Sequence, residues 1–189
     1  LNLPAVALLP LSYGSVAAGL NADKIALIVN EADPLSLEIG RYYAEKRGIS
    51  PFNIARIRLP HQRAVLSSGD FKNLLKKVIS QVPPDVQAYV LTWLAPYRVD
   101  CMSITSAFTF GFAHRYCALD CKPTAPNPYF DSDSKSAFRD FGMRPTMTIA
   151  AETIEQARAL IDRGVAADAT DPKGSAYLVV TKDKARSSR

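Results

Sequence analysis

Two patterns of apolar residues alternate along the first half of the chain. Two short, mostly apolar runs, residues 24–30 and 88–93, are typical of buried strands. A third strand is expected over residues 53–60, where Ile54, Ile57 and Leu59 alternate imperfectly with polar residues up to Pro60. Between them, apolar residues recur every three or four positions over residues 36–48 and 67–82, which is the spacing of one face of an amphipathic helix. This alternation of strand and helix predicts parallel strands joined by crossover helices.

Residues with strong backbone preferences mark the ends of these helices. Ser36 is the expected N-cap of the first helix, and Gly48 is its expected stop. Pro83 and Pro84 end the second helix, because proline lacks the backbone N–H that a helix needs.

The same pattern resumes late in the chain, with a helix expected over 152–164 that stops at Gly164 and a strand expected over 175–181. We therefore expect residues 1–189 to form a single α/β domain. Its predicted architecture is a three-layer sandwich with a mainly parallel sheet, of the flavodoxin-like or caspase-like kind. Residues 183–189 read as the first turn of another helix, so we expect the domain to be incomplete at its C-terminus.

The section between these two parts, residues 97–146, departs from the pattern. It holds all three cysteines, one of the two histidines, and many aromatic residues and prolines. A connection of this length is usually functional or an insertion. We expect a long loop or insertion after the third strand, in which residues 103–112 form either a short helix or an apolar loop.

Composition and charge narrow the class of protein. The 189 residues are 48% hydrophobic and 22% charged, which is typical of a folded domain. The net charge of +5 is spread along the chain rather than gathered with aromatic residues, so no nucleic-acid partner is expected. No apolar run reaches the roughly 18 residues of a membrane span. The chain begins at Leu1 rather than methionine, and we expect that an upstream part, such as an export signal, has been removed.

The ends of the predicted strands offer candidate binding residues. Ligands of parallel α/β sheets bind at the carboxyl ends of the strands. The segments after the three strands carry polar side chains, including Glu31, His61 and Arg63, and we expect a small molecule or a protein partner to bind at this edge. The candidate ligand-binding residues are Asn30, Asp33, Tyr97, Arg98 and Asp100.

Ordinary structural roles compete with this hypothesis. Asp33 before Pro34 is also a helix-start signal. Arg98 can pair with Asp100 on a surface loop, which contributes little to stability.

A cysteine nucleophile is the second functional hypothesis. It requires a thiolate beside an imidazole. The candidate catalytic residues are Cys101 with His61, or Cys101 or Cys117 with His114. The competing interpretation is that Cys101 is a small buried apolar residue. The sequence leaves open whether the chain is an enzyme.

The stretch HRYCALDC permits a metal site or a disulfide. His114, Cys117 and Cys121 would share one face of a helix, and Cys101 would complete a set of three thiolates and one imidazole for zinc. The pairing that we expect is instead a disulfide between Cys117 and Cys121, with Cys101 to either of them and free thiols as alternatives.

The familiar signatures of cofactor binding and hydrolysis do not occur. The sequence contains no GxGxxG, GxxxxGK[ST], HExxH or GxSxG. Residues 131–134, DSDS, lack the glycine and glutamate of a calcium loop. No cofactor is therefore expected.

Three longer phrases carry a resemblance to a known family. IVNEADPLSLEIGRYYAEKRGI, LTWLAPYRVDCMSITSAFTFGF and RALIDRGVAADATDPKGSAYLVVT resemble an uncharacterised family of bacterial proteins that co-occurs with the exosortase protein-sorting system. The likeness runs from Ala22 to the end, and members of the family are longer than this chain. It implies an exported, periplasmic or envelope-associated protein, and it implies no activity, cofactor or catalytic residue.

A second resemblance concerns architecture alone. A parallel sheet with cysteine and histidine at strand ends is similar to the caspase and gingipain type of cysteine peptidase, but no His-Gly follows the third strand, where Ala95 and Pro96 stand. The first functional hypothesis is thus an exported protein that binds a ligand or partner at the carboxyl edge of the sheet. A cysteine-dependent hydrolase and a domain with a structural zinc site are the alternatives.

Overall fold

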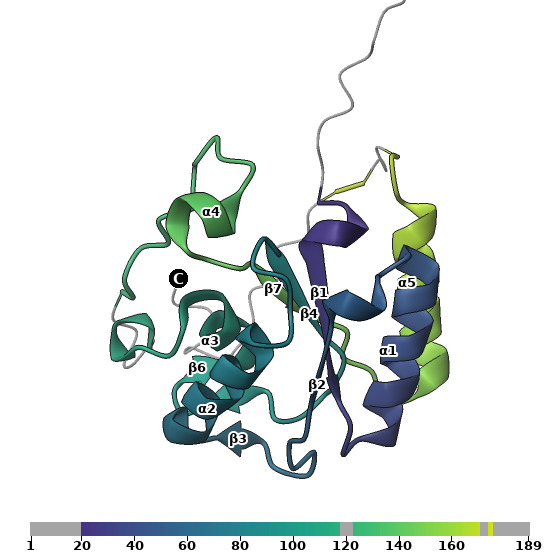
Figure 1. Ribbon diagram of the computed structural model, residues 1–189, viewed down its shortest axis with the longest axis horizontal. Helices are drawn as coiled ribbons and strands as arrows, with labels where there is room; N and C mark the ends of the chain where they lie inside the picture. The colour runs from purple at the N-terminus through teal and green to yellow at the C-terminus, as the bar shows by residue number, and fades with distance from the viewer. Residues whose placement is uncertain (1–19, 118–122, 171–173, 176–189) are drawn as a thin grey trace, which may run out of the picture.

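The computed structural model describes residues 20–117, 123–170, 174 and 175. Within these residues a parallel sheet is covered by helices on both faces (Figure 1), which confirms the predicted three-layer α/β sandwich. All but the first residue of the strand expected over 175–181 lies outside the described residues.

Within the described residues the main sheet has four parallel strands in the order β2-β1-β4-β7. The predicted strands correspond to β1 (Ile25–Asn30), β2 (Ile54–Ile57) and β4 (Ala88–Leu91), whereas β7 (Thr146–Thr148) was not predicted. β1 lies between β2 and β4, with Leu27 in register with both partners, and all four residues of β4 are buried.

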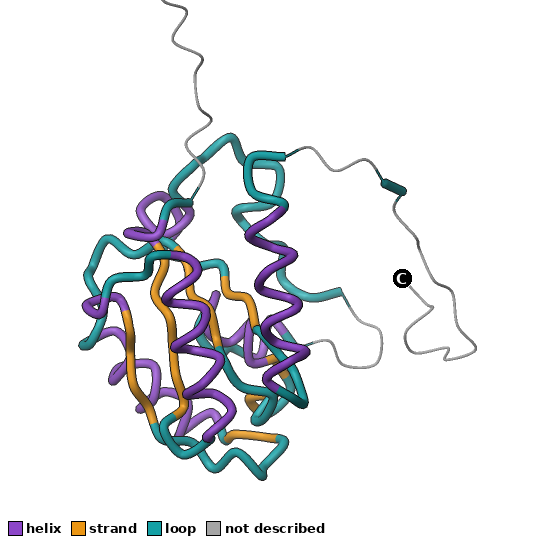
Figure 2. The backbone as a smooth tube through the Cα atoms, turned by 90° about the vertical axis from the view of Figure 1, so that its right-hand side faces the viewer, coloured by secondary structure: helices purple, strands orange, loops and turns teal. Residues whose placement is uncertain are grey.

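Two helices, α1 (Pro34–Arg47) and α5 (Ile154–Ala166), cover one face of this sheet and lie in front of the strands in Figure 2. Gly40 allows the close approach of α1 to β1, because a Cβ atom there would meet Cγ2 of Val29 at 2.7 Å. The buried side chains of this layer come from both helices and from β1 and β4: Leu27, Val29, Ile39, Tyr43, Val90, Ala157 and Ile161.

Two of the predicted helix ends differ from those in the structure. The N-cap of α1 is Asp33, whose carboxylate accepts a hydrogen bond from the Leu35 N–H at 3.0 Å, and not Ser36, which is buried. Gly48 is confirmed as the stop, because it adopts the left-handed conformation that glycine favours. Gly164 does not end α5, which continues to Ala166.

The opposite face is covered by α2 (Ser68–Ile79) and α3 (Ile104–Phe110). The Ser67 hydroxyl caps α2 by accepting a hydrogen bond from the Asp70 N–H at 3.1 Å. The buried side chains of this layer include Ile28, Ile57, Phe71, Leu74, Val78, Tyr89, Leu91, Trp93 and Phe108.

The section 97–146 holds short regular elements. Besides α3 and the start of β7, they are β5 (Arg98–Val99), β6 (Met102–Ser103), the 3-10 turn η3 (His114–Tyr116) and α4 (Ala137–Phe141). Two other 3-10 turns lie outside this section: η1 (Ala22–Lys24) precedes β1, and η2 (Pro51–Asn53) precedes β2. Residues 103–112 thus contain a helix, one of the two predicted possibilities. β5 and β6 join β3 (Val65–Leu66) in a second sheet of order β3-β5-β6.

This section also contributes to the core. Val99, Met102, Ile104 and Phe108 are buried in the same cluster as the side chains of α2. Residues 99–108 of the section are therefore packed into the domain. Among the described residues, no helix has the length and apolar character that a membrane span requires.

Candidate functional site

The point where ligands usually bind in such a sheet is filled by buried polar side chains. The chain leaves β1 toward β2 on one side and leaves β4 toward β7 on the other, so the connections diverge between β1 and β4. Here Asn30, Ser36 and Thr92 are all fully buried. The Ser36 hydroxyl accepts the Asn30 backbone N–H at 2.9 Å and lies 2.7 Å from the Thr92 hydroxyl, which donates to the Ile28 carbonyl at 3.2 Å.

The Asn30 side chain joins the end of β1 to the segment after β2. Its Oδ1 accepts hydrogen bonds from the N–H groups of Ala32 at 3.1 Å and Leu59 at 2.9 Å, and its Nδ2 donates to the Leu59 carbonyl at 3.1 Å. The amide is therefore engaged inside the protein, although the sequence suggested it as a ligand-binding group.

The other four predicted ligand-binding residues have different surroundings. Asp33 caps α1, and the carboxylate of Asp100 accepts the Ser68 N–H at the start of α2 at 3.0 Å. Tyr97 and Arg98 are exposed, and the backbone N–H groups of both point to the Ala64 carbonyl. Of the five, Asp100 lines a pocket.

We call this cavity the carboxyl-edge pocket. It has a volume of about 620 Å³ and opens beside the end of β2, between β3, α2 and the turn that joins β5 to β6. Its apolar wall consists of Leu59, Pro60, Val65, Leu66 and Leu74. Its polar lining consists of Arg58, Arg63, Ser67, Asp70, Asn73, Lys77 and Asp100.

The carboxylates of this pocket are already engaged, whereas two of its cations are not. Asp70 accepts a hydrogen bond from the Ser67 hydroxyl at 2.8 Å, and Asp100 accepts one from the Ser68 N–H at 3.0 Å. Nε of Arg58 lies 3.4 Å from the Glu31 carboxylate. Arg63 and Lys77 form no ion pair with any described residue. An anionic group that entered the pocket would thus find two cations without an ion-pair partner among the described residues, in a lining that also carries the charges of Asp70 and Asp100.

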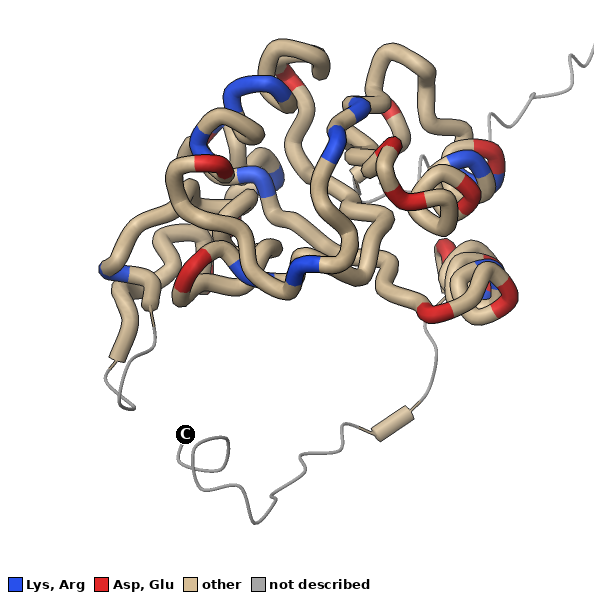
Figure 3. Tube along the Cα trace, turned by 90° about the horizontal axis from the view of Figure 1, so that it is seen from below, with Lys and Arg blue, Asp and Glu red and all other residues tan. Residues whose placement is uncertain are grey.

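The sequence pointed to Arg63 but missed Arg58 and Lys77. Lys77 is remote from any strand end in the sequence, and only the packing of α2 beside β2 brings it to the pocket. Figure 3 shows the molecule from the carboxyl edge of the sheet, with basic and acidic positions interspersed. The distribution of charged residues therefore does not single out the carboxyl-edge pocket.

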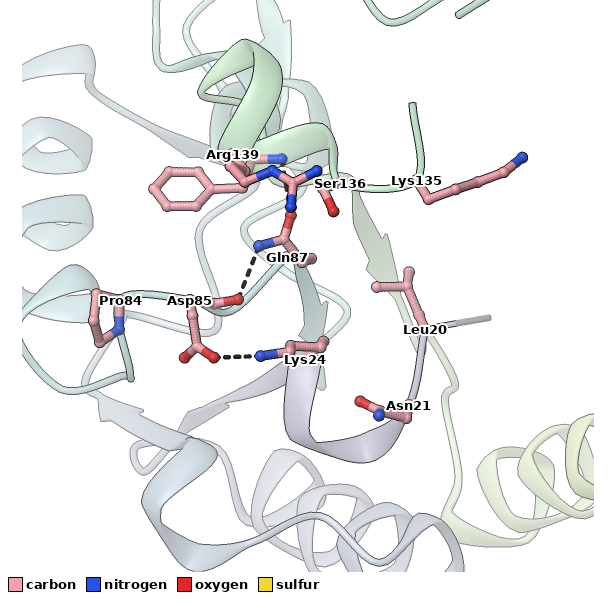
Figure 4. A pocket seen from close by; sticks show the side chains of 10 residues that line it. Leu20, Asn21, Lys24, Pro84, Asp85, Gln87, Lys135, Ser136 and Arg139 are labelled. Carbon is pink, nitrogen blue, oxygen red and sulfur yellow. Dashed lines mark hydrogen bonds and ion pairs between the residues drawn. The ribbon is translucent and has the colours of Figure 1, made fainter. Parts of the chain in front are cut away.

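A second pocket of about 580 Å³ opens at the amino ends of the strands, and Figure 4 shows its lining. Lys24 forms an ion pair with Asp85, and its hydrogen bond lowers the pKa of that carboxyl. Arg139 is 2.9 Å from Asp140 and in the same way lowers the pKa of Asp140. Two of the three cations around this cavity are therefore neutralised, and the cavity lies away from the edge where α/β sheets bind ligands.

A buried guanidinium lies beside this second pocket. Arg144 stacks on the ring of Phe138 at 3.3 Å and donates to the carbonyls of Val86 at 2.9 Å and Pro84 at 3.2 Å. Burial lowers the pKa of Arg144, and burial raises the pKa of the neighbouring Tyr89. These contacts join α4 and the start of β7 to β4, which is a structural role.

The cysteines form a disulfide that differs from the predicted pair. Cys101 is bonded to Cys117, with the two Cα atoms 5.4 Å apart, which excludes the Cys117–Cys121 bond because a sulfur takes one disulfide partner. Cys101 lies in the turn between β5 and β6, and Cys117 follows η3, and both pack against the same apolar cluster. Cys121 lies outside the described residues.

His114 completes a compact group with this disulfide. One of its ring nitrogens and the sulfurs of Cys101 and Cys117 all lie within 4.8 Å of one another, and the histidine is exposed. His61 does not belong to this group and is exposed in the loop after β2. With both sulfurs bonded, neither described cysteine offers the thiolate that a cysteine-dependent hydrolase needs.

The chain matches no protein-family model, no curated protein and no solved structure. The resemblance to the exosortase-associated family therefore stays a prediction.

Proposed function

We propose that this domain binds a small anionic ligand with an apolar part in the carboxyl-edge pocket. The observation that carries this proposal is the lack of ion-pair partners for Arg63 and Lys77 among the described residues, in a pocket whose carboxylates accept hydrogen bonds from the start of α2. Hydrogen bonds to charged groups contribute about 1.5–3 kcal/mol each, so two such cations suffice to orient one anionic group.

The apolar wall defines the rest of the ligand. Leu59, Leu66 and Leu74 lie on one side of the cavity, and burial of apolar surface against them contributes roughly 25 cal/mol per Å². A volume of about 620 Å³ is within the range of small-molecule sites. A carboxylate, sulfonate or phosphate attached to an aromatic or aliphatic body fits both features.

Two neighbouring lysines on α2 allow a matched test. Lys77 lines the pocket, whereas Lys76 does not, and both are exposed. With anilinonaphthalene sulfonate as the fluorescent probe, Lys77→Ala and Arg63→Ala are each expected to weaken binding about tenfold, which corresponds to 1.4 kcal/mol. Lys76→Ala removes the same charge and is expected to leave the affinity unchanged. Equal weakening by the two lysine variants would mean that the probe follows overall charge and not this pocket.

We also propose that the protein works in an oxidising compartment outside the bacterial cytoplasm. The disulfide between Cys101 and Cys117 supports this proposal, because stable disulfides are typical of exported proteins. The resemblance to the exosortase-associated family points the same way.

Alkylation of thiols in intact cells, before lysis, tests this location. We expect Cys101 and Cys117 of the natively produced protein to be protected from the reagent until a reductant is added. The variant Cys117→Ser is expected to expose Cys101 to labelling, which calibrates the measurement. Complete labelling of both cysteines in the native protein without reductant would contradict the proposed location.

A further inference from the structure

We propose that reduction of the Cys101–Cys117 disulfide creates a zinc site in which the two thiolates and the imidazole of His114 are the protein ligands. The three ligand atoms already lie within 4.8 Å of one another. Zinc binds thiolates at about 2.3 Å and imidazole at about 2.0–2.1 Å, so the ligands of one ion are about 3.3–3.8 Å apart. The site therefore needs only small movements of its side chains.

Contacts other than the disulfide hold these ligands together. The Cys117 N–H donates to the His114 carbonyl at 3.0 Å, and the Ala113 N–H points to the sulfur of Met102 at 3.4 Å, beside Cys101. The rings of Phe110 and Tyr116 stack at 4.5 Å. The segment around η3 thus remains attached to the β5–β6 turn when the bond between the sulfurs is broken.

The surroundings of the three ligands suit zinc, which is a borderline-soft cation. Cys117 is buried and Cys101 is half-buried against apolar side chains, whereas His114 is exposed, with its ring nearly perpendicular to that of Phe112. An ion could reach the site from the side of His114. Three protein ligands leave one position of a tetrahedral zinc ion for water or another group, as in sites with two cysteines and one histidine.

A dithiol can supply the two electrons and two protons that reduction of the disulfide requires. Two electrons from the dithiol break the S–S bond, two protons pass to the sulfurs of Cys101 and Cys117, and the dithiol becomes a disulfide. Zinc then displaces both thiol protons as it binds. Because the same two sulfurs form either the disulfide or the zinc thiolates, the oxidised protein cannot hold the ion in this way.

Zinc binding by the full chain tests the proposal directly. The protein is reduced with a phosphine, which avoids the competing dithiol, loaded with zinc, and freed of excess metal before metal analysis. We expect one zinc per chain in the reduced protein and none after reoxidation. His114→Ala is expected to weaken zinc affinity at least about tenfold, because loss of even an outer-shell group costs 10- to 100-fold. Cys101→Ser is expected to abolish stoichiometric binding.

One control variant and two further measurements keep the result interpretable. His61→Ala removes the other histidine and is expected to retain full zinc binding. Circular dichroism checks that each variant is folded. When Co²⁺ replaces zinc, the charge-transfer absorption of the cobalt–thiolate bonds shows that the sulfurs are ligands. Zinc that survives in a folded Cys101→Ser variant, or an unchanged zinc affinity in a folded His114→Ala variant, would overturn the proposed ligand set, and loss of zinc in Cys121→Ser would point to Cys121 in its place. A reduced, folded protein without zinc would overturn the site itself.

Discussion

Replacing Asn30 with alanine is expected to lower the free energy of unfolding by about 3–5 kcal/mol. The side chain is fully buried and satisfies both the N–H and the C=O of Leu59 as well as the N–H of Ala32. A buried backbone group that loses its partner costs about 1–3 kcal/mol, and alanine supplies no replacement. Chemical denaturation with linear extrapolation measures the change.

Asn73→Ala is the matched control for this prediction. Asn73 is exposed on α2, so its replacement is expected to change the free energy of unfolding by no more than about 0.5 kcal/mol. Thr92→Val removes only the hydroxyl bonded to Ser36 and Ile28, and we expect an intermediate loss. If Asn30→Ala cost no more than Asn73→Ala, the buried polar network would not be what joins the ends of β1 and β2.

The result matters for function because the network occupies the place where doubly wound sheets usually bind ligands. Asn30, Ser36 and Thr92 fill the divergence point between β1 and β4 with hydrogen bonds. The cavity is displaced to the end of β2, where α2 and the small second sheet form its walls. The general rule for this fold predicts a ligand site at this edge, and the hydrogen-bonded network leaves the cavity of this edge beside the end of β2.

Most of the fold was predictable because the spacing of apolar residues marks the central strands and the longer helices. β1 and β4 are central strands whose consecutive buried residues leave a clear signal, and α2 has a regular apolar face. β7 was missed because Thr146, Met147 and Thr148 form a short strand in which no residue is fully buried. β3, β5 and β6 have two residues each, which is too few to show a period.

The candidate site was less predictable because its members meet only in three dimensions. The sequence indicates that Asn30 follows a strand, but not that its amide turns inward to Leu59. The disulfide joins residues 16 positions apart, and no spacing rule favours that pair over Cys117 with Cys121. Lys77 enters the pocket through the packing of a helix. Hydrophobic periodicity carries no information on such contacts.

Replacing Phe108 with alanine is expected to cost about 3–5 kcal/mol of unfolding free energy, the usual range for a buried phenylalanine. Phe108 of α3 is 3% exposed, and its ring meets the rings of Phe71, Tyr89 and Trp93 at centroid distances of 5.2, 6.1 and 6.3 Å. Edge-to-face pairs add about 0.5–1.5 kcal/mol beyond burial. The substitution thus removes contacts to α2, β4 and the segment after β4 together.

This prediction decides whether the section 97–146 is part of the fold or an addition to it. Phe130 lies in the same section and is 83% exposed, so Phe130→Ala is expected to change the unfolding free energy by no more than about 0.5 kcal/mol. A large loss for Phe108→Ala in a single cooperative transition means that α3 unfolds with the sheet. A small loss, or a separate early transition, would mean that the section is a docked insertion, and the disulfide and His114 would then belong to a unit that can move independently of the carboxyl-edge pocket.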